Sequence, residues 1–176
     1  MTAEPADAGD DQHWGPQRSK TVTWHEPGPS TAKGLSMAGI DYLRAMVAGE
    51  LPPPPIAGLM QFELAEAEPG RVVFTCQPDE SAYNPIGAIH GGLVCTLLDS
   101  VVGCALHSTL PQGKGYTSIE IKVNYLKAVR VSSGLLTATG TVVKSGARVG
   151  FTEGVVTDAK GAVVATASST LLVFDL

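Results

Sequence analysis

One long apolar segment of this chain contains a single charged side chain. Between Glu80 and Lys114 only Asp99 carries a formal charge at neutral pH, and the apolar residues from Gly91 to His107 recur on nearly every side of a helix. A helix that is apolar nearly all round is a buried one. The rest of the chain must therefore provide a cover for this helix, and that requirement constrains the fold more than any other feature.

The segments before and after this helix have strand patterns. Residues 56–68 and 71–78 indicate two strands joined by a Pro-Gly turn, and residues 119–125 alternate apolar and polar side chains as a half-buried strand does. Three more strands, linked by hairpin turns, are predicted at 135–144, 148–158 and 162–174. This order predicts an α+β fold, an antiparallel β-sheet wrapped around a long central helix. Because one curved sheet does not cover such a helix completely, we expect a second copy of the chain to complete the cover.

The N-terminal part of the chain has a different composition. Residues 1–35 are rich in Pro, Gly and Asp without a hydrophobic period, which is typical of a flexible N-terminal tail. Residues 36–49 have the apolar spacing of a short helix, and Pro52–Pro55 then forms a stiff spacer. We therefore expect a tail over 1–35 and one folded domain over 36–176.

Composition excludes several classes of function. The net charge is −5 and no basic stripe is present, so nucleic-acid binding is not expected. No apolar run is long enough to span a bilayer and the N-terminus lacks an apolar signal region, so we expect no membrane association and a cytoplasmic location. The three cysteines lack a metal-ligand spacing and are expected to be reduced core residues, with no bound metal.

The entry to the apolar helix is rich in turn residues and glycine. Asn84-Pro85 and Gly87 precede His90-Gly91-Gly92, so free backbone N–H groups at the start of the helix can face an anion or a polarised carbonyl. The carboxylate of Asp99 is costly to bury unless a partner group or a reaction uses it. The alternatives are structural: a tight helix entry, a neutral histidine bonded into a turn, and an acid bonded to a neighbouring hydroxyl.

These residues resemble the signature of a known family. The pattern Asn84-x-x-Gly87-x-x-His90-Gly91-Gly92, followed by Asp99 on the same helix and by the strand 117–125, is similar to that of hotdog-fold thioesterases of the phenylacetate-degradation (PaaI-like) type in the 4HBT superfamily. The resemblance covers about residues 36–176. It implies hydrolysis of acyl-CoA thioesters by a homodimer at least, and by a homotetramer of two dimers in many members. Active sites at the dimer interface are implied as well.

The resemblance also implies roles for individual residues. Asp99 matches the catalytic carboxylate, which acts as general base or nucleophile, and Gly91 matches the backbone N–H that polarises the thioester carbonyl. Asn84 matches the polar residue near the thioester. Ser118 matches the hydroxyl that holds the attacking water, and we expect it to come from the other subunit. His90 matches a histidine that shapes the loop.

Further positions are candidates for substrate binding. Gly92 permits close approach to a ligand, and Thr117 is the alternative to Ser118 if the alignment slips by one residue. The phosphates of CoA require basic partners, for which Lys144 and Arg148, on either side of a Ser-Gly turn, are the first candidates. The weaker candidates for this role are Lys122, Lys127 and Arg130.

Two other functions remain open at this point. One is a hotdog hydratase or dehydratase acting on acyl-CoA or acyl-carrier protein, although the usual Asp and His spacing of that chemistry is missing. The other is a non-catalytic acyl-CoA-binding module, against which the retained Asp99 argues. No cofactor is expected, because CoA is part of the substrate. An aliphatic and a simple aryl acyl group are both compatible with the sequence.

Overall fold

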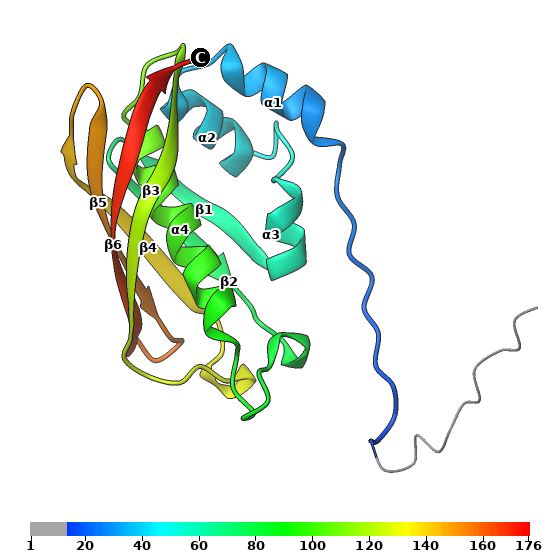
Figure 1. Ribbon diagram of the computed structural model, residues 1–176. Helices are drawn as coiled ribbons and strands as arrows, with labels where there is room; N and C mark the ends of the chain where they lie inside the picture. The colour runs from blue at the N-terminus through cyan, green and yellow to red at the C-terminus, as the bar shows by residue number, and fades with distance from the viewer. Residues whose placement is uncertain (1–13) are drawn as a thin grey trace, which may run out of the picture.

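The computed structural model describes residues 14–176, which form one antiparallel β-sheet with helices on one of its faces (Figure 1). The sheet has six strands in the order β1-β2-β4-β5-β6-β3. The strands are β1 (Phe62–Glu68), β2 (Arg71–Cys76), β3 (Lys114–Tyr125), β4 (Leu136–Ser145), β5 (Val149–Thr157) and β6 (Val163–Asp175). The helices are α1 (Pro27–Leu35), α2 (Gly39–Val47), α3 (Pro55–Met60) and α4 (Gly91–His107), with short 3-10 turns η2 (Glu80–Ala82) and η3 (Val131–Ser133). The predicted α+β class is confirmed.

Two segments differ from the sequence-based expectation. Residues 27–35, expected within the tail, form α1, which has Pro27 at its first turn. Residues 55–60, expected at the start of a strand, form α3. Pro55 occupies the first helical position, where its missing N–H costs nothing, and Gln61 ends the helix in a left-handed conformation (φ 57°). The strand β1 begins directly after this reversal.

The long helix α4 lies against the concave side of the sheet and contacts every strand from β2 to β6. Close approach is possible because glycines of the central strands face the helix. A Cβ atom at Gly140 would clash with the Val101 carbonyl, and one at Gly154 would lie 2.9 Å from a methyl group of Val102. Leu97, at the centre of this contact, is fully buried. The glycines therefore fix the depth at which α4 lies in the sheet, and with it the position of Asp99.

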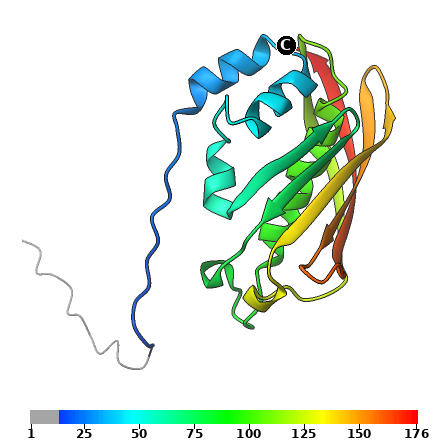
Figure 2. The same cartoon turned by 180° about the vertical axis from the view of Figure 1, so that it is seen from behind.

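Within residues 14–176 the strand β3 forms one edge of the sheet and pairs only with β6, its neighbour on one side. A register shift between Ser118 and Glu120 makes a bulge at Ile119, whose side chain is 57% exposed. The view from behind shows that the other edge, β1, lies beside the helices α2 and α3 (Figure 2). The edge at β3 therefore remains open in the single chain.

The sheet covers α4 incompletely. The side of α4 that carries Gly92, Thr96 and Asp99 is turned away from the sheet, and Asp99 is exposed in the single chain. The expected burial of the aspartate is therefore not met by one chain alone. Among the described residues, no helix is both long enough and apolar enough to cross a membrane.

Candidate active site

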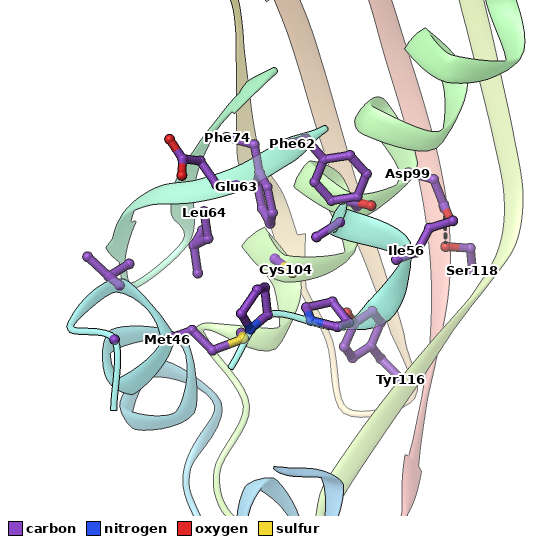
Figure 3. Close-up of a pocket in the computed structure, with 16 residues that line it drawn as sticks. Met46, Ile56, Phe62, Glu63, Leu64, Phe74, Asp99, Cys104, Tyr116 and Ser118 are labelled. Carbon is purple, nitrogen blue, oxygen red and sulfur yellow. Dashed lines mark hydrogen bonds between the residues drawn. The ribbon is translucent and has the colours of Figure 1, made fainter. Parts of the chain in front are cut away.

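The carboxylate of Asp99 is paired with a hydroxyl from the edge strand. Ser118 Oγ donates a hydrogen bond to Asp99 Oδ1 at 2.7 Å (Figure 3). Both residues belong to the same chain, so the expectation that Ser118 would come from another subunit is wrong. The carboxylate lies in the middle of α4, and the bulge at residue 119 brings Ser118 to the helix side of β3. A hydroxyl that donates to one oxygen holds the carboxylate in one orientation and leaves its second oxygen for another partner.

The neighbouring residue Thr117 does not share this position. Thr117 is exposed and lies opposite Leu172 in the β3–β6 register, whereas Ser118 is half-buried and faces α4. The choice between these two residues, which the sequence left open, is therefore decided for contact with Asp99 in favour of Ser118.

An elongated cavity of about 450 Å³ opens beside the Asp99–Ser118 pair. Figure 3 shows the pair at one end of the cavity and Met46 and Leu64 toward the other. Its walls come from α2, the proline segment (residues 52–54), α3, β1, β2, β3 and α4. Its lining includes Phe62, Phe74, Ile56, Pro53, Pro54, Cys104 and Tyr116. An apolar cavity that ends at an oriented carboxylate can hold the apolar part of a substrate next to a reactive group.

Two polar groups of the cavity wall, the Tyr116 hydroxyl and the Cys104 thiol, lie close to each other. Burial raises the pKa of the Cys104 thiol to about 12. Burial likewise raises the pKa of the Tyr116 hydroxyl well above its usual value. Both groups are therefore neutral at physiological pH. The thiol is not a nucleophile there, because the thiolate form is the reactive one.

The start of α4 carries the second group of predicted residues. His90 is the N-cap of the helix, and its Nδ1 accepts a hydrogen bond from the Gly92 N–H at 2.9 Å. This bond uses Nδ1 as an acceptor and caps the first turn of α4. Because the Gly92 N–H is used inside the chain, it is not free for a ligand.

Gly91 has the N–H that the substrate role requires. Among residues 14–176 no hydrogen-bond acceptor is found for this N–H, which lies at the first position of α4 where the helix dipole is positive. The ring of Tyr125 occupies the space that a side chain would need, since a Cβ atom at Gly91 would lie 3.1 Å from Tyr125 Cζ. Tyr125 also donates a hydrogen bond to the Gly91 carbonyl at 2.9 Å. The role of Tyr125 in holding the helix start had no signal in the sequence beyond its place on a strand.

Asn84 organises the turn that leads to the helix. Its Oδ1 accepts hydrogen bonds from the N–H groups of Ile86 and Ala88, both at 3.1 Å, and Gly87 follows in the left-handed region (φ 75°). A side-chain amide that accepts through oxygen in this way still has two N–H donors. Asn84 can therefore hold its turn and donate to a ligand at the same time.

The two groups of residues are separated within one chain. Gly91 and Asp99 are eight positions apart on the same helix, which corresponds to about 12 Å along its axis. His90 and Gly92 line a different cavity, which they share with Leu93 and Thr96. One thioester carbonyl cannot contact the Gly91 N–H and the Asp99 carboxylate of the same chain.

The predicted phosphate-binding residues lie elsewhere. Lys144 is near the end of β4 and Arg148 just precedes β5, on either side of the hairpin turn. Neither lines the cavity of Asp99. Lys127 is instead engaged by Asp158, whose carboxylate lies 2.7 Å from its ammonium group. The role of Lys144 and Arg148 toward CoA stays a prediction. Among the described residues, no cluster of metal-ligating side chains is present.

The fold and the paired carboxylate define the class of the protein. A curved antiparallel sheet around one long helix, with an acid on the exposed side of that helix, is the hotdog fold. A thioesterase family protein from Silicibacter pomeroyi shares this fold with a TM-score of 0.67 at 24% identity, over 76% of this chain and 96% of that one.

Sequence comparison points to the same class of protein. The thioesterase superfamily matches residues 86–165, a little under half of the chain. Human acyl-coenzyme A thioesterase 13 is 31% identical over 94 residues, which are 53% of this chain and 66% of the human protein, slightly under two thirds. A Streptococcus mutans protein whose crystal structure contains acetyl-CoA is 29% identical, with a TM-score of 0.60 over 65% of this chain and 89% of that one.

Proposed function

We propose that this protein hydrolyses acyl-CoA thioesters to a free acid and CoA. The observation that carries the proposal is the Ser118–Asp99 hydrogen bond of 2.7 Å at the end of an apolar cavity. The human relative is an acyl-CoA thioesterase by name, and the Streptococcus mutans relative was crystallised with acetyl-CoA. These names support acyl-CoA as the substrate class.

The proposed reaction needs a nucleophile and a group that stabilises the oxyanion. Asp99 takes a proton from a water molecule that attacks the thioester carbonyl, and this proton then passes to the departing CoA sulfur. In the alternative route Asp99 attacks the carbonyl itself and displaces the CoA thiolate, and water then hydrolyses the resulting mixed anhydride to the free acid and the Asp99 carboxylate. Ser118 orients the carboxylate for either step. The Gly91 N–H, at the positive end of a helix dipole, donates to the carbonyl oxygen as negative charge develops on it. The CoA thiolate then leaves and is protonated.

The proposed site is formed by two chains. Because Gly91 and Asp99 of one chain are too far apart, the helix start of one subunit faces the Asp99–Ser118 pair of the other. The open edge of β3 supports a dimer, since an unpaired strand edge is a template for pairing with another chain. Exposed Ile119, Tyr125 and Leu126 along this edge provide apolar area for the contact.

A tetramer of two such dimers requires a second surface. The outer face of the sheet offers exposed apolar side chains at Val143, Phe151 and Val155. Phe151→Glu should convert a tetramer into an active dimer, which light scattering during size-exclusion chromatography would measure. An unchanged mass would show that this face is not the contact between dimers.

The direct test of the proposed activity is a panel of acyl-CoA substrates. The purified protein is expected to release free thiol from at least one acyl-CoA, with the free acid as the other product. Loss of water from a hydroxyacyl-CoA without thiol release would instead identify a dehydratase. Tight binding of acyl-CoA with no turnover of any substrate would identify a binding module, and either result would overturn the proposal.

The binding of CoA phosphates by Lys144 and Arg148 is part of the same proposal. Replacing both residues by glutamine should raise the KM for acyl-CoA and leave the KM for a thioester without phosphates unchanged, because only CoA carries the charges that they would neutralise. Equal KM values for the two substrates in the variant and the wild type would remove both residues from the site.

A further inference from the structure

The cavity beside Asp99 has a polar end and an apolar end. Asp99 and Ser118 lie together at the polar end, while Met46 and Leu64 belong to the remote wall. Figure 3 shows the Glu63 carboxylate pointing away from the other labelled side chains. A group that enters from the reactive end therefore meets side chains of decreasing polarity along its length.

The width of the cavity is limited by aromatic rings. Phe62 and Phe74 pack edge to face, with ring centroids 5.7 Å apart and an angle of 75° between the rings. Edge-to-face packing is a preferred arrangement of aromatic rings, and these two rings form one continuous wall of the cavity. Tyr116 and Pro54 also line the cavity, and Figure 3 shows Tyr116 well separated from Phe62. The remote wall contains the flexible side chains of Met46 and Leu64, which adapt to an aliphatic chain end.

The volume of the cavity sets the size of its occupant. A methylene group is similar in size to a water molecule, whose share of liquid volume is about 30 Å³. A cavity of about 450 Å³ that also holds the reacting carbonyl therefore accommodates roughly eight to twelve carbon atoms of an acyl chain. A short acyl group or a single ring would leave the remote end empty, with the loss of the contacts there.

Most of the remote wall lies outside the part of the chain that matches the superfamily. Met46 is on α2, Pro53 and Pro54 belong to the proline segment, and Leu64 is on β1, all of which precede residue 86. The proline segment connects α2 to α3 and has little conformational freedom. The remote wall is therefore built from segments that precede the matched region, and the prolines hold the backbone of one of them in place.

We propose that this cavity binds an unbranched aliphatic acyl chain of about eight to twelve carbons, and that Met46 and Leu64 set its maximum length. The inference rests on the proposed thioesterase function and specifies its substrate class. Each additional methylene that enters the cavity adds apolar contact, and its full burial corresponds to roughly a fourfold gain in kcat/KM.

The test is the dependence of kcat/KM on acyl length for the full-length protein. Saturated acyl-CoA substrates from two to eighteen carbons are compared with phenylacetyl-CoA, with thiol release as the readout. We expect kcat/KM to rise with length to a maximum between eight and twelve carbons, at least a hundredfold above that for acetyl-CoA. A maximum at acetyl-CoA, at phenylacetyl-CoA or beyond fourteen carbons would overturn the inference.

Variants at the remote wall give a second, independent readout. Leu64→Trp should shift the maximum to about six carbons. If Leu64→Trp does not fold, Met46→Phe fills the same end of the cavity with a smaller increase in side-chain size. Leu35→Trp, on an exposed position of α1 outside the cavity, is the matched control. An unshifted profile in a folded wall variant contradicts the inference, whereas no turnover of any substrate by wild type contradicts the proposed function itself.

Discussion

The start and the middle of α4 present different kinds of chemistry to a substrate. At its start the helix offers a backbone N–H at Gly91, held in place by the His90 cap and the Asn84 turn. At its middle it offers a side-chain carboxylate, held by Ser118. The chemistry at the start of α4 depends on the backbone conformation, because the donor is a backbone N–H. The chemistry at the middle of α4 depends on the side chain, because the reactive group is a carboxylate.

This difference determines which substitutions can separate the two regions. Replacing a carboxylate by an amide removes a base without moving the backbone. No such replacement exists for the Gly91 N–H, which is altered only by filling the space in front of it or by changing the turn that precedes it. The comparison also explains why one helix can serve two sites in a dimer, with its start in one site and its middle in the other.

The largest effect is expected at the middle of the helix. Asp99→Asn should lower kcat for acyl-CoA hydrolysis by about 10²- to 10⁴-fold, the usual contribution of a general base. The melting temperature should change little, because asparagine keeps an oxygen that can accept the hydrogen bond from Ser118. Glu68→Gln, which changes an exposed carboxylate at the end of β1 outside the cavity, is the control. Full activity of Asp99→Asn would remove the carboxylate from the mechanism.

A smaller effect is expected at the turn before the helix. Asn84→Asp keeps the oxygen that accepts from Ile86 and Ala88 but has no N–H to donate, so the turn persists and the donor is lost. We expect kcat/KM to fall by about tenfold to a hundredfold, as for a lost hydrogen bond to a developing charge. Wild-type kinetics would show that Asn84 acts only in the turn.

The Ser118 hydroxyl should contribute less to kcat than the Asp99 carboxylate does. Ser118→Ala removes the hydrogen bond that orients the carboxylate, and kcat should fall by about tenfold. Thr117→Ala removes the neighbouring hydroxyl, which lies on the exposed side of the same strand, and should leave kcat unchanged. A larger loss at residue 117 than at residue 118 would show that the register around the bulge is different.

The smallest effect concerns stability at the start of α4. Lys127 and backbone N–H groups hold the pKa of the Asp158 carboxyl below its usual value. The loop that follows Lys127 contacts the segment before α4, because the Val129 carbonyl accepts a hydrogen bond from the Ile89 N–H. A lowered pKa in the folded state stabilises the protein above the unfolded-state value of about 3.9. That stabilisation disappears as the pH falls through the folded-state pKa.

Melting temperatures as a function of pH test this pair. Asp158→Asn should lower the melting temperature at pH 7, and the difference from wild type should shrink as the pH falls below about 4. The Asp99–Ser118 region should keep its kcat once the variant is folded at 25 °C. A difference that does not depend on pH would exclude the ion pair as its cause.

Much of this fold could be predicted from local patterns. The apolar helix at Gly91–His107 and the hairpin-linked strands after residue 135 follow from residue periodicity, and the structure places them within one or two residues of the expected bounds. The helix α3 could not be predicted this way. It is 6 residues long and depends on Pro55 at its start and on the reversal at Gln61.

The residues of the candidate site could be predicted from the sequence, but which of them contact each other could not. The glycine-rich motif and the isolated Asp99 are visible in the sequence. The contact between Asp99 and Ser118 depends on a bulge at residue 119, for which the alternating pattern of β3 gives no sign. The cavity wall was missed because Met46, Phe62 and Phe74 look like ordinary core residues until the chain folds.

The most direct test of the two-chain site is the activity of mixed subunits. Asp99→Asn and Asn84→Asp chains, each with strongly reduced activity, are unfolded together, refolded and assayed for thiol release. If the start of α4 in one chain serves Asp99 of the other, half of the dimers are mixed and each contains one intact site. About a quarter of wild-type activity should therefore return. Activity that stays at the mean of the two separate variants would contradict a site shared between chains.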